Sequence, residues 1–135
     1  MFERFDDAAR KAMALANQEA QRTGDDFIRP EHLLIGIVQT GDSVGARTLR
    51  LLNVDLESAR REQALLVAAP APPTKKVIEL AIEESAAFGH THVGTEHMLL
   101  ALLREVDGPA VQILGALGLS ADEVRRAVLG LLEQG

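Results

Sequence analysis

The segment EHLLIGIV at residues 31–38 returns as EHMLLALL at residues 96–103, and this repetition decides how the chain folds. At the same shift of 65 positions, and without a gap, Glu19 matches Glu84. Further identities at this shift are Lys11 with Lys76, Leu15-Ala16 with Leu80-Ala81, Gly24 with Gly89, Asp42 with Asp107, Leu49 with Leu114, Leu52 with Leu117, and Arg60-Arg61 with Arg125-Arg126. An ungapped match of this extent indicates an internal duplication, in which the two copies bury their apolar faces against each other.

Prolines mark the boundary between the two copies. The stretch Ala68-Ala69-Pro70-Ala71-Pro72-Pro73 has three prolines in four positions, which remove backbone donors and favour extended structure. We therefore expect repeat one at residues 1–67, a linker at 68–73 and repeat two at 74–135. Because the linker is short, the repeats should pack together as one domain.

Capping and stop signals divide each repeat into four helices. In repeat one, Asp6 or Asp7 caps a first helix that runs to about Arg22 and stops at Gly24, and Pro30 stands in the first turn of a second helix that ends at Gly41. Ser43 caps a third helix that runs through Leu52 and stops at Asn53, and Asp55 caps a fourth helix that runs to about Val67. In repeat two the signals are Thr74 and Gly89 around the first helix, Thr95 as the cap of the second, Pro109 in the third, and Ser120 with Glu123 before the fourth. No segment alternates steadily between apolar and polar residues, so we expect an all-α chain without strands.

Composition narrows the function classes. Hydrophobic residues make up 47% of the 135 residues, aromatic residues only 3%, and the net charge is −6, which argues against a non-specific nucleic-acid binder. There is no cysteine, which excludes disulfides and thiol catalysis. No apolar run is long enough to span a membrane, and the first residues lack the pattern of a secretory signal, so we expect a cytoplasmic protein.

Two Glu-His pairs are the main candidates for binding chemistry. Glu31 and Glu96 each stand at the start of the second helix of their repeat, where unpaired backbone N–H groups and a positive dipole favour anions. A carboxylate at that place can also pair with a guanidinium, so a group that is both cationic and phosphorylated would suit the site. The alternative is that both carboxylates only complement the helix dipole. His32 and His97 are expected to be structural histidines.

A histidine cluster raises the question of a metal. His90, His92 and His97, with Glu96 as a base, could form the zinc site of a hydrolase. The spacing does not match H-E-x-x-H, and Asp25 and Phe27 stand at the positions in repeat one that match the first two histidines. We therefore expect a hydrogen-bonded loop without a metal, and the hydrolase remains the alternative. No phosphate-binding loop of the G-x-x-x-x-G-K-[ST] type is present, and neither a cofactor nor catalysis is expected.

The residues before and along the first helix are a second candidate surface. Phe2 and Phe5 are two of only four aromatic residues. The residues expected to surround them are Arg10, Met13 and Asn17 in repeat one and Lys75 and Glu79 in repeat two. An apolar anchor ringed by charge is typical of peptide-binding surfaces, and a hydrophobic staple that fixes the helix entry is the alternative.

Three motifs carry a family resemblance. The start Met1-Phe2-Glu3-Arg4-Phe5 resembles that of ClpC-type protease chaperones. Residues 94–100, Gly-Thr-Glu-His-Met-Leu-Leu, resemble the Gly-Thr-Glu-His-Ile-Leu-Leu signature of these chaperones, and residues 75–80 resemble the start of their second repeat. The whole chain thus resembles their N-terminal domain. The resemblance implies an eight-helix, pseudo-two-fold domain that docks protein substrates and adaptors for a Clp ATPase, which works with the ClpP peptidase. A free-standing decoy or adaptor is the alternative.

The resemblance also implies ligands. Some members recognise phosphorylated arginine, which would place Glu31 and Glu96 on the guanidinium, with Thr95 and Arg47 near the phosphate. In others the N-terminal face binds cyclic peptides, which here implies the surface that contains Phe2 and Lys75. Repeat one departs from the signature because Arg29-Pro30 replaces Gly-Thr, and repeat two has Gln112 at the position that matches Arg47. We therefore expect repeat two, through Glu96, to be the principal site.

Overall fold

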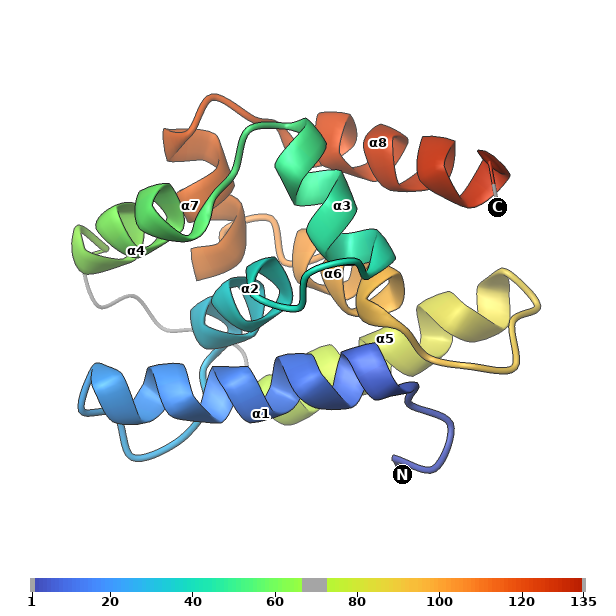
Figure 1. Ribbon diagram of the computed structural model, residues 1–135, viewed down its shortest axis with the longest axis horizontal. Coiled ribbons are helices and arrows are strands. Elements are labelled where there is room, and N and C mark those ends of the chain that lie inside the picture. Colours follow the sequence, from blue (N-terminus) through green and yellow to red (C-terminus); the bar gives the residue numbers. More distant parts are fainter. Residues whose placement is uncertain (1, 67–72, 135) are drawn as a thin grey trace.

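The computed structural model describes residues 2–66 and 73–134, and the described residues form eight helices (Figure 1). Their bounds are α1 Asp7–Arg22, α2 Pro30–Val38, α3 Val44–Leu51, α4 Leu56–Ala64, α5 Thr74–Ala87, α6 Thr95–Leu103, α7 Pro109–Ala116 and α8 Ala121–Gln134. The all-α prediction is confirmed, since the described part of the chain contains no strand beyond an isolated bridge between Phe5 and Val93. No described helix combines the length and apolar character needed to cross a bilayer.

The duplication is visible in how the helices pack. Within the repeats, α1 packs on α2 and α5 packs on α6. Between the repeats, α2 contacts α7 while α3 contacts α6, and α4 contacts α7 while α3 contacts α8. Each contact recurs with the roles of the repeats exchanged, which is the pattern of a pseudo-two-fold axis between them. The linker expected at 68–73 falls outside the described residues except for Pro73, which directly precedes α5.

Most of the expected caps are present. The Asp6 carboxylate accepts a hydrogen bond from the backbone N–H of Ala9 at 2.8 Å, and Ser43 caps α3 through the N–H of Ala46. Asn53 adopts the left-handed conformation expected after α3, with a φ of 64°. The Asp55 cap and the Ser120–Glu123 capping box are also formed.

Two boundary predictions are wrong. Gly94, rather than Thr95, is the N-cap of α6, because the Thr95 hydroxyl instead accepts a hydrogen bond from the backbone N–H of Gly45 at 2.9 Å. That N–H belongs to the first turn of α3, where a donor has no partner within its own helix, so a contact between repeats replaces the local cap. Helix α4 ends at Ala64, short of the expected Val67, which lies outside the described residues.

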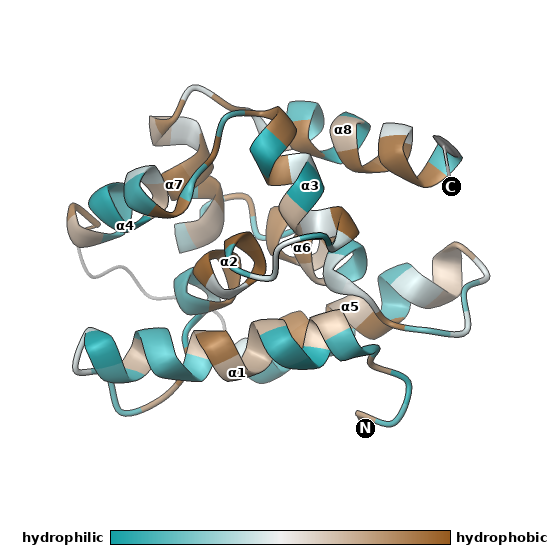
Figure 2. Ribbon diagram, viewed as in Figure 1, coloured by the Kyte–Doolittle hydropathy of each residue, from teal (hydrophilic) through white to brown (hydrophobic). Residues whose placement is uncertain are grey.

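The core is centred on α2 and α6. All nine residues of α6 and eight of the nine in α2 are buried, and both helices lie in the middle of the bundle in Figure 1. Figure 2 shows the contrast with α4, which is mostly hydrophilic. Helix α2 approaches α1 closely at Gly36, where an added Cβ would lie 2.3 Å from the carbonyl oxygen of Ala12.

Gly36→Ala is therefore expected to lower the free energy of unfolding by about 1–3 kcal/mol, since the obstructing atom is backbone and both helices must shift. Gly115→Ala in α7 is the matched control. An added Cβ there meets nothing within 4 Å, so alanine should leave stability unchanged or raise it by up to about 1 kcal/mol. Urea unfolding of both variants measures the difference, and equal losses would contradict the close approach.

Candidate functional site

Histidines anchor the start of both central helices. The ring nitrogen Nδ1 of His32 accepts the backbone N–H of Arg29 at 2.9 Å, and Nδ1 of His97 accepts that of Gly94 at 2.9 Å. A neutral ring that accepts at Nδ1 carries its proton on Nε2. His32 points this nitrogen toward Asp25, and His97 points it toward His90. Both rings are fully buried, so these are structural histidines, as expected.

Burial also fixes the charge of the second ring. It lowers the pKa of His97 to about 4, and the neighbouring Glu96 carboxylate only partly offsets this effect. The imidazole is therefore neutral near pH 7 and supplies no positive charge to its surroundings.

The signature carboxylates Glu31 and Glu96 lie far less open to solvent than expected for residues that present charge to an incoming chain. Glu31 is 8% exposed and Glu96 is 5% exposed. They have different partners, since Glu31 accepts from the guanidinium of Arg29 at 2.9 Å and Glu96 lies 3.3 Å from the imidazole of His92. The two repeats therefore give the same carboxylate different surroundings.

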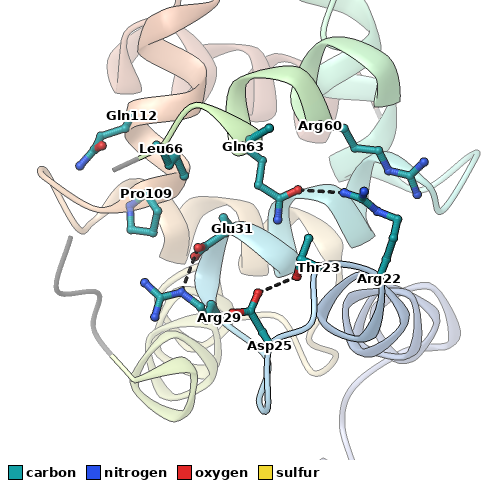
Figure 3. A pocket seen from close by; sticks show the side chains of 11 residues that line it. Arg22, Thr23, Asp25, Arg29, Glu31, Arg60, Gln63, Leu66, Pro109 and Gln112 are labelled. Atoms are coloured by element: carbon teal, nitrogen blue, oxygen red, sulfur yellow. Dashed lines mark hydrogen bonds and ion pairs between the residues drawn. The ribbon is translucent and has the colours of Figure 1, made fainter. Parts of the chain in front are cut away.

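A cavity of about 360 Å³ opens beside Glu31. Its walls come from the loop between α1 and α2, from α4 and from the start of α7, as Figure 3 shows. Pro109 and Gln112 of α7 form the wall supplied by repeat two. The cavity thus lies between the repeats and needs both of them.

One oxygen of Glu31 is left without a partner. Oε2 takes the hydrogen bond from Arg29, while Oε1 is buried and has no hydrogen-bond partner among the described residues. An unsatisfied buried acceptor costs on the order of 1–3 kcal/mol, and a carboxylate oxygen costs more. A ligand that donates a hydrogen bond to this oxygen would remove that cost.

Two further guanidinium groups line the same cavity and are held in place by one buried carboxylate. Glu19 is 2% exposed and accepts from Arg22 at 3.1 Å and from Arg60 at 3.0 Å. Burial raises the pKa of Glu19, but the hydrogen bonds from Arg60 and Arg22 outweigh it and hold the pKa below its ordinary value. Glu19 therefore stays charged and orients both guanidinium groups, whose side chains remain partly exposed.

A second carboxylate, from Asp25, borders the cavity. The hydroxyl of Thr23 donates to Asp25 at 2.6 Å and lowers the pKa of that carboxyl, with a smaller contribution from His32. Arg29, Glu31 and Asp25 lie close together in Figure 3, with Arg22 on the opposite side. The cavity therefore contains guanidinium groups that can bind an anion, and carboxylates that can accept hydrogen bonds from a ligand.

The third helices contribute to sites across the repeats. Gln112 of repeat two, matched in the sequence to Arg47 of repeat one, lines the cavity of Glu31 in repeat one. Thr95 of repeat two likewise bonds to Gly45 of repeat one. Each site is built across the repeats, which a comparison within one repeat cannot reveal. Arg47 is exposed and borders a separate groove with Arg50, Leu51 and Leu131.

Around Glu96 the structure gathers ligand atoms of the kind that metals bind. Two groups of side chains bring one such atom each to within 4.8 Å of one another: His90, His92 and His97 in the first, and Asp6, His92 and Glu96 in the second. Asp6 was noted in the sequence only as a helix cap. Its place in the second group depends on contacts between the N-terminal segment and the loop before α6.

At the N-terminal face, Phe5 is the buried anchor and Phe2 is 43% exposed, with their rings edge to face at 5.3 Å. Arg10 donates to the carbonyl oxygens of Phe2 and Phe5, so it holds the N-terminal segment in place. The other predicted residues differ in exposure: Met13 is partly buried against the core, whereas Asn17, Lys75 and Glu79 are exposed.

Several residues of the cavity were not recognised as such in the sequence. They are the lining residues Arg22, Asp25, Arg60, Gln63 and Gln112, and Glu19, which orients Arg22 and Arg60. One available signal was Glu19, a carboxylate beside the small residues that α1 buries. Another was the repeated Arg60-Arg61 pair.

Comparison with known proteins identifies a family match for the chain and several similar proteins. The model of the Clp repeat (R) N-terminal domain matches residues 4–72 and again residues 69–135. A 141-residue alignment shows 40% identity to "Negative regulator of genetic competence ClpC/MecB" of Bacillus subtilis, and covers 98% of this chain and 17% of that protein. "Chaperone protein ClpB" of Oceanobacillus iheyensis is 39% identical with the same coverage. This chain therefore spans about a sixth of the length of these relatives.

A solved structure agrees on the fold. The N-terminal domain of the chaperone ClpD from Arabidopsis thaliana superposes with a TM-score of 0.81 at 24% identity, over 98% of this chain and 97% of that one.

Proposed function

Because the chain belongs to the Clp repeat (R) N-terminal domain family, we propose that it is a non-catalytic recognition domain that receives protein substrates or adaptors for a Clp ATPase. Its relatives include ClpC and ClpB proteins, and it covers about a sixth of their length. Within this role the cavity beside Glu31 takes an arginine side chain of the bound protein, preferentially a phosphorylated one.

The unpartnered oxygen of Glu31 carries this proposal. A guanidinium group presents several N–H donors in one plane, and such a donor would satisfy Oε1. A phosphate on the same side chain would face the guanidinium groups of Arg22 and Arg60, which Glu19 already orients. A ligand that carries a donor and an anion side by side matches the mixed charge of the cavity better than a purely basic or acidic one.

The start of α2 supplies a further contribution. Glu31 is the second residue of that helix, so the positive end of the helix dipole lies beside the cavity and favours a phosphate. Arg29 already occupies Oε2 of Glu31. The ligand is therefore expected to bind through Oε1 beside Arg29, whose charge also favours the phosphate.

Fluorescence polarisation with labelled peptides tests the proposal. One peptide sequence is used with phosphoarginine, arginine or phosphoserine at the central position. We expect the phosphoarginine peptide to bind most tightly and to weaken as salt rises, since ionic contacts in a solvent-accessible cavity are screened. Equal affinity for all three peptides would contradict the assignment.

A second candidate ligand is an apolar or cyclic peptide on the N-terminal face, favoured by the exposed ring of Phe2. Burial of apolar surface is insensitive to moderate salt, in contrast to ion pairing. Binding that persists at high salt and is lost in Phe2→Ala would therefore assign the ligand to this face. If the domain is a free-standing decoy that sequesters such peptides, we expect the same salt-insensitive binding and the same loss in Phe2→Ala.

A further inference from the structure

We infer that Asp6, His92 and Glu96 form a binding site for one divalent transition-metal ion. Each residue offers one ligand atom, and these atoms lie within 4.8 Å of one another. Two carboxylates and one imidazole are donors that zinc and manganese accept, and three protein ligands leave room for water or a further group. This site is separate from the Glu31 cavity, and does not depend on what that cavity binds.

Backbone hydrogen bonds hold the three ligands together from distant parts of the sequence. The N–H of Asp6 donates to the carbonyl of Val93 at 3.0 Å, and the N–H of Val93 donates to the carbonyl of Arg4 at 2.8 Å. The bridge between Phe5 and Val93 is parallel, so Asp6 runs alongside Gly94, and His92 and Glu96 each lie two residues from Gly94 in the sequence. The ligand positions are thus set by the fold, which favours metal affinity.

The two carboxylates meet over Gly94. An added Cβ on Gly94 would lie 2.2 Å from Oε1 of Glu96 and 3.0 Å from Oδ2 of Asp6. Among the described residues, the only ion pair of Glu96 is with His92, which is itself a member of the group. Two carboxylates that converge in this way, one of them nine-tenths buried, repel each other until a cation lies between them.

The pseudo-symmetry shows that repeat two lacks the side-chain cation that pairs with the signature carboxylate of repeat one. The residue that matches Gly94 in repeat one is Arg29, whose guanidinium pairs with Glu31 at 2.9 Å. Repeat one therefore supplies a covalently attached cation to its signature carboxylate. Repeat two replaces that arginine with glycine, against which the carboxylates of Glu96 and Asp6 lie, and adds His92 where repeat one has Phe27. A bound metal ion would supply to Glu96 the positive charge that Arg29 supplies to Glu31.

The alternative group that contains His97 is a poorer ligand set. Nδ1 of His97 accepts the N–H of Gly94, so its Nε2 carries the proton and donates to Nδ1 of His90 at 2.8 Å. Neither nitrogen of His97 then has a lone pair for a metal. In Asp6, by contrast, only Oδ1 is used by the cap of α1, and Oδ2 remains on the side of Glu96.

Titration of the whole domain with zinc chloride in a calorimeter tests the site. We expect one zinc ion per chain, with affinity reduced at least tenfold in Asp6→Asn and in His92→Phe. Asparagine caps helices about as well as aspartate, so Asp6→Asn removes the charge and keeps the cap. Glu31→Gln is the matched control from repeat one and should bind zinc like the wild type.

The same samples give a second readout, because a metal that binds only the folded protein raises its melting temperature. That rise should appear in the wild type and in Glu31→Gln, and shrink in Asp6→Asn and His92→Phe. The proposal is overturned if the wild type shows no saturable zinc binding or if both ligand variants bind zinc normally. A loss seen only in His90→Ala would also overturn it, since the ligands would then be the other histidines.

Discussion

A phosphoarginine peptide is expected to bind Glu31→Gln at least tenfold more weakly than it binds the wild type. Glutamine keeps the size of the side chain but removes the charge that pairs with a guanidinium. Truncating one partner of a hydrogen-bonded, largely buried charge pair typically costs about 2–5 kcal/mol, which is more than tenfold in affinity. Fluorescence polarisation at low salt measures the change.

Glu96→Gln is the matched control, because Glu96 occupies the same position in repeat two. Its carboxylate pairs with His92 and lies against Gly94, away from the Glu31 cavity. This variant should therefore bind the peptide within about threefold of the wild type. The reverse pattern, with the loss confined to Glu96→Gln, would assign the ligand to repeat two, as the sequence alone suggested. Circular dichroism of both variants verifies that they are folded.

Glu19→Gln is expected to lower the free energy of unfolding by roughly 2–3 kcal/mol. Breaking a fully buried ion pair costs about 3–5 kcal/mol. We expect a smaller loss here because the side chains of Arg22 and Arg60 are 46% and 35% exposed, so that solvent screens their charges. The same change should loosen both guanidinium groups and weaken phosphoarginine binding. Urea unfolding measures the loss of stability.

Glu84→Gln is the control for this prediction, since Glu84 matches Glu19 in repeat two. Its ion pair is with Arg104, at 4.0 Å, on a partly exposed surface, so the expected cost is below about 1 kcal/mol. Similar losses in the two variants would show that Glu19 contributes no more than an ordinary surface carboxylate.

The pKa of Glu19 predicts how its effect depends on pH. Because the folded-state pKa lies below the ordinary value of 4.5, the unfolded chain takes up a proton on this group before the folded protein does. The stabilisation is complete above pH 4.5 and is lost as the pH falls through the folded-state pKa. The stability difference between the wild type and Glu19→Gln should therefore shrink on acidification below pH 4.5.

The fold could be predicted from the sequence because its determinants are local. The caps at Asp6, Ser43 and Asp55 and the left-handed Asn53 act within a few residues of the helix that they end or begin. The shift of 65 positions then required the second half to repeat the first. The cap predicted at Thr95 failed for the opposite reason, because a backbone donor from the other repeat competes for its hydroxyl.

The candidate sites could be predicted only in part. Position in a helix identified Glu31 and Glu96 but not their surroundings, which come from residues distant in sequence. Gln112 lines the cavity beside Glu31 through the packing of α7 on α2, and Asp6 reaches Glu96 through the bridge between Phe5 and Val93. Burial of the two carboxylates follows from the same packing between repeats, and no pattern within one repeat reports it.

The place where a phosphoarginine peptide binds can be measured by NMR chemical-shift changes in the isotope-labelled domain. We predict the largest changes at the backbone amides of residues 29–32 and at the side-chain amides of Gln63 and Gln112, which line the Glu31 cavity. Changes confined to residues 2–17 or to the surroundings of Glu96, with the Gln112 amide unmoved, would contradict it.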